Sequence, residues 1–299
     1  MTQPSILLTN DDGVDAPGLA SLYEELSAFA DVTVIAPTEN RTGVGRARNG
    51  TVTVSEHSWG YKLMGTPADC VAFGLGGGVD ADFEMVVAGV NDGPNIGNYV
   101  LGRSGTVGAC MEAAFLDTPG LAVSAYHSRD YHCYPPEEYE FNRPASVARQ
   151  LLEELVETDL LSEIEVLNVN APVDRVSPPL RLTRLVADYS QRVEYDAEDA
   201  ANAGQCQDSI PDRDASRTNL AGTEVELVDK TWPHVEGYEN PLEGAAQYRD
   251  RYPEASDRRA LIDGAVSVSP LSVTLSSRDS PELVSLIETL NGSEQPTGE

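Results

Sequence analysis

Lysine is almost absent from this sequence. Lys62 and Lys230 are the two lysines among 20 basic residues, whereas acidic residues number 49 and the net charge is −29. A surface this acidic repels nucleic acid duplexes and anionic membranes at ordinary salt. It suits a very salty cytoplasm, because a Debye length of about 3 Å near 1 M salt screens the self-repulsion. The scarcity of lysine beside this charge therefore favours a halophile over an ordinary acidic bacterial protein.

Cysteine is also scarce, and long apolar runs are missing. The four cysteines show no C-x-x-C spacing, so in a cytoplasmic chain we expect buried or spare thiols rather than disulfides or a zinc site. No run approaches the roughly 18 apolar residues of a membrane span. Residues 1–5 lack the basic and apolar parts of a secretory signal. We expect a cytoplasmic protein without a membrane partner.

Histidine offers little as a metal ligand. The four histidines are scattered, and two of them, His127 and His132, share the polar stretch "YHSRDYHCYPP". A metal site is conceivable there, but the polarity favours a solvated loop. We assign these histidines no role.

Three well-known nucleotide and phosphate signatures are missing. A dinucleotide fingerprint needs G-x-G-x-x-G after the first strand, where this chain carries acids instead. The stretch "GVGRAR" begins G-x-G, but Arg48 stands where the third glycine belongs. No G-x-x-x-x-G-K of a P-loop occurs. A signalling receiver domain is rejected as well, because it needs a lysine at a particular later strand end and neither Lys62 nor Lys230 lies in a suitable place.

Apolar strands and amphipathic helices alternate along the first 170 residues. A strand at 5–9, a helix from Pro17 and a strand at 32–37 make one parallel βαβ unit. In "GTPADCV", Thr66 is expected to cap a helix, with Asp69 completing a capping box. Further elements are expected as a hairpin at 51–55 and 61–64, strands at 85–90, 121–125 and 165–172, and helices at 17–29, 104–117 and 145–157. The pattern predicts an α/β fold with a doubly wound, mostly parallel, Rossmann-like sheet.

The composition changes near residue 188. Residues 1–187 are predicted to form the α/β core, and 188–257 an acidic arm or insertion that is poor in aliphatic residues and used in oligomerisation. A strand is possible at 223–229 within it. Residues 258–290 return to strand and helix character and are expected to complete the core or to be exchanged with a partner. Residues 291–299 are expected to be a disordered tail.

Polar loops follow three of the predicted parallel strands, and such strand ends share one edge of a sheet. The loops are "NDDG" with Asp11 and Asp12, "NRTG" with Thr42, and "NDGPNIG" with Asn91 and Asn95. Carboxylate, hydroxyl and amide oxygens suit Mg²⁺ or Mn²⁺ rather than a soft metal. Adjacent acids can also be a plain polar turn, but their position at a strand end favours a cation site.

A helix is expected to begin directly after these loops, at "SGT". The backbone N–H groups of Ser104, Gly105 and Thr106 would then form an anion cradle. Each of these pieces is, alone, more typical of a cap or a turn than of a site. Their joint placement predicts a hard cation beside an anion cradle, an arrangement that suits phosphoryl transfer.

Four ordered stretches resemble the SurE (survival protein E) family of metal-dependent nucleotide phosphatases. They are "ILLTNDDGVDAPGL", "VIAPTENRTG", "GTPADCV" and "VVAGVNDGPNIGNYVLGRSGTVGACMEA", and the similarity returns at "DRRALIDGAVSVSPLSVTL". The resemblance implies hydrolysis of nucleoside 5′- and 3′-monophosphates to nucleoside and inorganic phosphate. It implies one divalent ion per subunit, held by Asp11, Asp12, Thr42 and Asn91. It further implies a phosphate site made of Asn95, Ser104, Gly105 and Thr106.

The sequence departs from the family pattern in two places. Thr42 stands where relatives usually have serine, and Arg103 precedes "SGT" where many carry an aromatic residue or histidine. The family forms dimers or tetramers through exchanged C-terminal segments and a protruding hairpin, for which 188–257 is the expected counterpart. The resemblance therefore implies a homo-oligomer.

Two mechanisms and two functions remain open. Asp11 and Asp12 are the expected catalytic residues, one of them positioning or deprotonating a water that attacks the phosphate. A covalent aspartyl-phosphate is the rival mechanism, although the D-x-D arrangement usual for it is missing. A non-catalytic, metal-dependent nucleotide-binding module is the alternative function.

Overall fold

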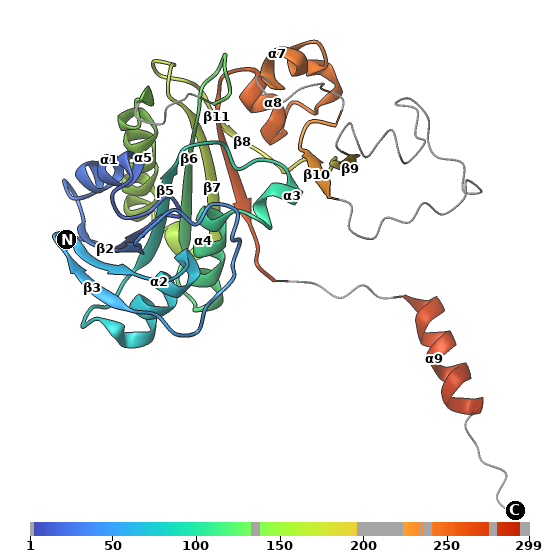
Figure 1. The fold of residues 1–299 in the computed structure, drawn as a ribbon, viewed down its shortest axis with the longest axis horizontal. Helices are drawn as coiled ribbons and strands as arrows, with labels where there is room; N and C mark the ends of the chain where they lie inside the picture. Colours follow the sequence, from blue (N-terminus) through green and yellow to red (C-terminus); the bar gives the residue numbers. More distant parts are fainter. Residues whose placement is uncertain are drawn as a thin grey trace, which may run out of the picture.

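A mixed β-sheet organises the chain (Figure 1). The computed structural model describes residues 3–132, 138–195, 224–233, 235, 241–274 and 280–293. Within these ranges nine strands form the main sheet, in the order β3-β4-β2-β1-β5-β6-β7-β11-β8. The strands are β1 (Ser5–Thr9), β2 (Asp31–Pro37), β3 (Val54–His57), β4 (Gly60–Leu63), β5 (Met85–Asn91), β6 (Gly120–Tyr126), β7 (Val166–Pro172), β8 (Leu180–Leu182) and β11 (Val266–Leu271).

The six strands at the centre of the sheet are parallel, from β4 through β2, β1, β5 and β6 to β7. β3 pairs antiparallel with β4 as the predicted hairpin, with β3 starting three residues later and β4 one residue earlier than expected. β11 pairs antiparallel with β7, and β8 runs parallel to β11. The chain winds outward from β1 in one direction and then from β5 in the other. The sheet therefore has a switch point between β1 and β5, which is where such folds bind ligands.

Helices cover both faces of the sheet, as predicted for a doubly wound fold (Figure 1). One face packs against α1 (Pro17–Leu26) and α5 (Asn142–Glu157), and the other against α2 (Pro67–Phe73) and α4 (Gly105–Phe115). Two separate apolar clusters fill these layers, one on each side of the sheet. Strands buried on both faces explain the continuous apolar runs seen in the sequence.

Local signals set the starts of two helices. The Thr66 hydroxyl accepts a hydrogen bond from the Asp69 N–H at 3.1 Å, and the Asp69 carboxylate accepts one from the Thr66 N–H, which is the predicted capping box. Ser104 caps α4 by accepting from the Val107 N–H at 3.1 Å. α1 ends at Leu26, three residues before the predicted end, because the chain there tightens into turns directed at the Leu26 carbonyl.

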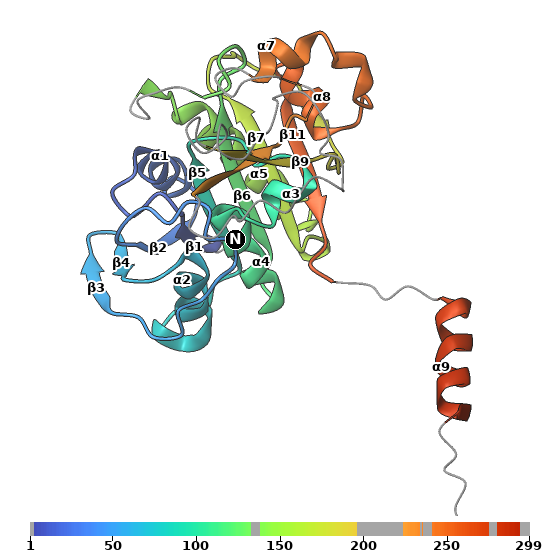
Figure 2. The same cartoon turned by 45° about the vertical axis from the view of Figure 1, so that its right-hand side comes forward.

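A smaller group of elements lies outside the main sheet, on the side where β11 and β8 lie (Figure 1). β9 (Ser190–Tyr195) and β10 (Val225–Lys230) form an antiparallel pair, next to α3 (Asn98–Leu101) in both views (Figure 2). A third apolar cluster joins Trp232 to Leu242, Tyr252 and Leu261. The remaining elements are η1 (Gly74–Gly78), η3 (Leu161–Glu163), α7 (Pro241–Ala246), η4 (Arg249–Arg251), α8 (Asp257–Ile262) and α9 (Pro281–Ser293).

The predicted division of the chain into core, arm, C-terminal segment and tail stays a prediction. β10 covers most of the strand expected at 223–229, and α9 begins at the expected Pro281. Residues 196–223 of the predicted arm, and 294–299 of the predicted tail, lie outside the described residues. α9 stands apart from the sheet in both views (Figures 1 and 2).

Candidate cation and phosphate site

A glycine turn brings two neighbouring aspartates to the end of β1. Gly13 has φ +105°, a conformation that favours glycine, and the Asn10 side-chain amide donates to the Gly13 carbonyl at 2.8 Å. In a strand, successive side chains point to opposite faces of the sheet. The turn removes that constraint from Asp11 and Asp12. Asp11 is 2% exposed and Asp12 is half-buried.

Asp11 lies against the first turn of α4. The Thr106 hydroxyl donates to Asp11 Oδ1 at 2.5 Å. A Cβ added to Gly105 would come within 2.7 Å of Asp11 Oδ2, so only glycine permits this approach. The structure therefore brings the predicted cation loop and the predicted phosphate loop into direct contact. Burial raises the pKa of Asp11, and hydrogen bonds led by that from Thr106 oppose the shift.

Asp12 faces a second carboxylate that the sequence analysis missed. Burial raises the pKa of Asp12 to about 8, and the charges of Asp11 and Asp92 add to the rise. The Asp92 backbone N–H and the Thr42 side chain hydrogen-bond to Asp12 and lower its pKa in part. Burial, followed by the charge of Asp11, also raises the pKa of Asp92. Without a counter-ion, three carboxylates therefore crowd one partly buried volume.

The two predicted asparagines are held differently. Asn91 ends β5, and its side-chain nitrogen donates to the Gly93 carbonyl at 2.5 Å, which orients the amide and leaves its oxygen as the group a cation could use. Asn95 is buried, and its side-chain nitrogen donates to Ser124 Oγ at 2.9 Å. That nitrogen carries a second hydrogen, which a phosphate oxygen could accept.

A network of buried polar side chains fixes the Asn95 backbone. Asn170 Oδ1 accepts from the Asn95 N–H at 2.7 Å, and the Asn95 carbonyl accepts from the side chains of Asn170 and Asn168 at 3.1 and 2.9 Å. Sequence reasoning found β7 but gave these two asparagines no role. The sequence did contain an indication of a role, because "EVLNVNAP" places two asparagines in an otherwise apolar strand. Buried amides need hydrogen-bond partners.

The residues present fit a hard cation. Asp11, Asp12, Thr42 and Asn91 offer only oxygen, which is what Mg²⁺ and Mn²⁺ prefer. The crowded carboxylates supply the charge that a divalent ion would offset. Among the described residues no group of three His, Cys, Asp or Glu side chains is arranged to hold a metal. A cation here would be bound by the hydroxyl and amide oxygens together with the carboxylates of Asp11 and Asp12.

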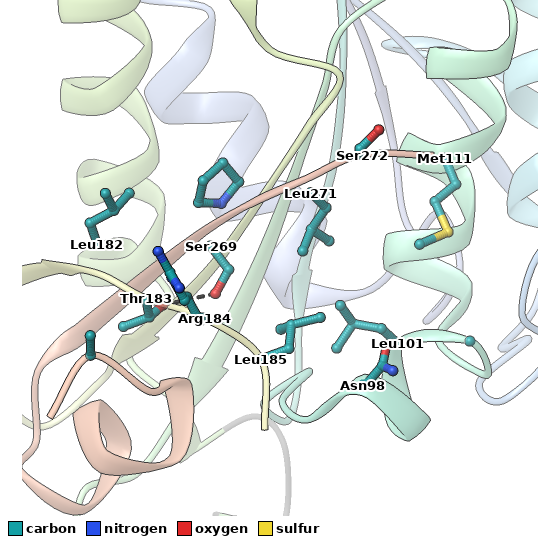
Figure 3. Close-up of a pocket in the computed structure, with 13 residues that line it drawn as sticks. Asn98, Leu101, Met111, Leu182, Thr183, Arg184, Leu185, Ser269, Leu271 and Ser272 are labelled. Carbon is teal, nitrogen blue, oxygen red and sulfur yellow. Dashed lines mark hydrogen bonds between the residues drawn. The ribbon is translucent and has the colours of Figure 1, made fainter. Parts of the chain in front are cut away.

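Several cavities open among the described residues. One of 310 Å³ opens beside Asp12 and Asp92, and one of 560 Å³ is lined by Tyr99, Arg103 and Tyr189. The third, of 720 Å³, separates α3 and α4 from β11, and Leu101, Leu185 and Leu271 point into it (Figure 3). No predicted site residue lines this third cavity.

The fold and site together define a doubly wound α/β protein with carboxylates at the switch point, set against the start of a helix. The family model described as survival protein SurE matches residues 6–192 of this chain. The chain belongs to the SurE family.

Relatives extend the match over most of the chain. The protein called 5′-nucleotidase SurE of Haloarcula marismortui is 38% identical over 294 residues, which is 97% of this chain and 96% of the relative. The 5′-nucleotidase SurE of Halobacterium salinarum is 37% identical over 274 residues, 90% of this chain and 92% of the relative.

A solved structure supports the fold. The crystal structure titled SurE protein from Aquifex aeolicus aligns with a TM-score of 0.69 and 26% identity, covering 95% of this chain and all of that one. Among the described residues, no helix has the length and apolar character needed to cross a membrane.

Proposed function

We propose that this chain is a metal-dependent phosphomonoesterase that hydrolyses nucleoside 5′- and 3′-monophosphates to nucleoside and inorganic phosphate. The observation that carries the proposal is the contact of Asp11 with Gly105 and Thr106, which joins a carboxylate pair to the start of a helix. The relatives named 5′-nucleotidase SurE support the 5′-nucleotidase part of this activity.

The proposed cation ligands are Asp11, Asp12, Thr42 and Asn91. One bound Mg²⁺ or Mn²⁺ would supply positive charge at the phosphate oxygens. The Ser104–Thr106 backbone, at the start of the eleven-residue helix α4, would bind the remaining phosphate charge. Asn95 would donate its second amide hydrogen to the same group.

In this proposal one aspartate handles the attacking water. Asp12 is the better placed, because it lines the 310 Å³ cavity whereas Asp11 is committed to Thr106. Asp12 orients the water or accepts its proton while the water oxygen bonds to phosphorus. The ester P–O bond breaks, and the departing nucleoside oxygen takes up a proton. A covalent aspartyl-phosphate is the rival, and trapping of an intermediate or solvent-oxygen labelling separates the two.

The direct test is phosphate release from AMP and from 3′-AMP, with added Mn²⁺ and with EDTA. The proposal expects release that depends on the metal. The alternative function, a nucleotide-binding module, expects metal-dependent binding of AMP by equilibrium dialysis without phosphate release. Activity unchanged by exhaustive EDTA treatment would remove the metal from the proposal.

The proposal includes a homo-oligomer, a dimer or tetramer. α9 supports it, because Leu283, Leu286 and Ile287 are half or more exposed and share one side of the helix. Val193 and Leu227 on the β9–β10 pair are exposed as well. A second copy would cover such surfaces. The charge balance is the reason to propose a salty cytoplasm as the compartment.

A further inference from the structure

An aromatic surface adjoins the proposed phosphate cradle and is not used by the chemistry described so far. Tyr99 on α3 stacks on Tyr189, with ring centres 3.5 Å apart and planes inclined by 15°. Arg103 lies two residues after the end of α3 and immediately precedes Ser104. These three residues are half of the six that line the 560 Å³ cavity.

Hydrogen bonds hold this surface in place. Arg103 donates to the Tyr99 hydroxyl at 3.0 Å and forms an ion pair with Asp229 of β10. The Tyr189 hydroxyl also donates to Asp229. The arm residue Asp229 therefore orients both the arginine and the second tyrosine. Aromatic rings that are already fixed lose little entropy when a ligand stacks on them.

One face of Tyr99 remains open. Tyr189 covers the other face, and the Arg103 guanidinium lies toward the hydroxyl edge, because it contacts that hydroxyl and its carbon is 5.7 Å from the ring centre. Tyr99 is accordingly 37% exposed and borders a cavity of the size that small ligands occupy.

We propose that the base of a nucleoside monophosphate stacks on the open face of Tyr99, with Arg103 beside its edge, while the phosphate lies at Ser104–Thr106. This inference rests on the proposed function and adds to it the part of the site that recognises the nucleoside. Arg103 directly precedes the cradle in the chain, so a single nucleotide can reach both parts. Every base has a π-face, so the surface favours nucleotides over base-free sugar phosphates and discriminates weakly among bases.

A purely structural role for the tyrosine pair makes a different prediction. If Tyr99 only fastened β9 to α3, its loss would disturb the cradle and affect all phosphate esters alike. The two readings therefore separate when AMP is compared with ribose 5-phosphate, which has the same phosphate and sugar but no base.

The experiment measures kcat/KM for AMP and for ribose 5-phosphate in the wild type and in Tyr99→Ala, Tyr99→Phe and Tyr248→Ala. Stacking of one base predicts that Tyr99→Ala lowers the AMP to ribose 5-phosphate ratio about 5- to 150-fold. Tyr99→Phe keeps the aromatic face and should keep the ratio within about twofold. Tyr248 is a partly exposed tyrosine that does not line the cavity, so Tyr248→Ala is the matched control.

An unchanged ratio in Tyr99→Ala would overturn the inference, whether both activities persist or both fall by the same factor. A wild type that releases phosphate from neither ester refutes the proposed function instead. Equilibrium dialysis of AMP then decides the base site, with weaker binding by Tyr99→Ala than by Tyr99→Phe expected and equal binding contradicting it.

Discussion

At the residue scale, two glycines make the candidate site possible. Gly13 turns the chain so that Asp11 and Asp12 are released from the alternation of a strand. Gly105 lets Asp11 approach α4 to a distance that a side chain would block. The sequence predicted the acids and the small residues, because both follow apolar strands. It did not predict Asp92, since an acid in a loop is usually solvated, nor the Tyr99–Tyr189 stack, which joins residues far apart in the chain.

Gly105→Ala tests the contact between the two loops. The added methyl group must displace Asp11, so we expect kcat/KM for AMP to fall about 10²-fold, as misplacement by about 1 Å can cause. Gly76→Ala is the matched control, because no atom lies within 4 Å of its added Cβ. Phosphate-release kinetics on both variants check this. Near-normal turnover of Gly105→Ala would show that the contact is dispensable.

The raised pKa of Asp12 predicts a pH dependence of the metal-free protein. Between about pH 4 and 8 the folded state keeps a proton that the unfolded chain has released, so stability should fall as pH rises through that window. Asp12→Asn cannot titrate there and should lose less stability. Thermal melts in EDTA from pH 5 to 8 at fixed salt measure this. If the melting temperatures of wild type and variant changed in parallel with pH, the raised pKa of Asp12 would be contradicted.

At the element scale, signals between neighbouring residues predicted the core helices and strands. Strands whose position depends on pairing with distant residues could not be predicted. The capping box of α2 and the strands β1, β5 and β7 were predictable because their apolar runs and caps are local. β8 has three residues and pairs with β11, more than eighty residues later, so no local pattern marks it. The antiparallel placement of β11 likewise depends on the edge that β7 offers. The asparagines of β7 show their role only once Asn95 is packed beside them.

The exposed apolar face of α9 is the proposed contact between subunits. A chain ending at Thr274, and a full chain with Leu283, Leu286 and Ile287 changed to Gln, should both form a smaller species in light scattering. Each should keep its stabilisation by Mn²⁺, because α9 contributes no site residue. Glu282→Gln with Glu288→Gln is the matched control on the same helix. An unchanged mass in both test variants would remove α9 from the proposed interface.

At the scale of the whole molecule, charge governs the conditions under which the fold persists. The net charge of −29 opposes compaction, and salt screens that repulsion. The matching relatives come mainly from halophilic archaea, which agrees with the halophile expected from the composition.

We expect both activity and melting temperature to fall when the protein is dialysed from molar KCl into dilute buffer. The Debye length grows from about 3 Å near 1 M to about 10 Å at 0.1 M, so repulsion then reaches across the surface. Circular dichroism melts and phosphate release along a KCl series check this. Sucrose, which stabilises folds without screening charge, is the control. Full activity and an unchanged melt in dilute buffer would contradict the expectation.

Asp12→Asn tests the central claim, a cation site that hydrolyses phosphate esters, most directly. The measurement is the melting temperature with and without Mn²⁺, taken beside phosphate release from AMP. Asparagine keeps the size and turn preference of aspartate, so a plain turn residue would tolerate it. If Asp12 is a cation ligand, Mn²⁺ stabilises the wild type but hardly the variant, and kcat falls at least about 10²-fold. Equal stabilisation of both proteins by Mn²⁺ together with near-normal turnover of the variant would contradict it.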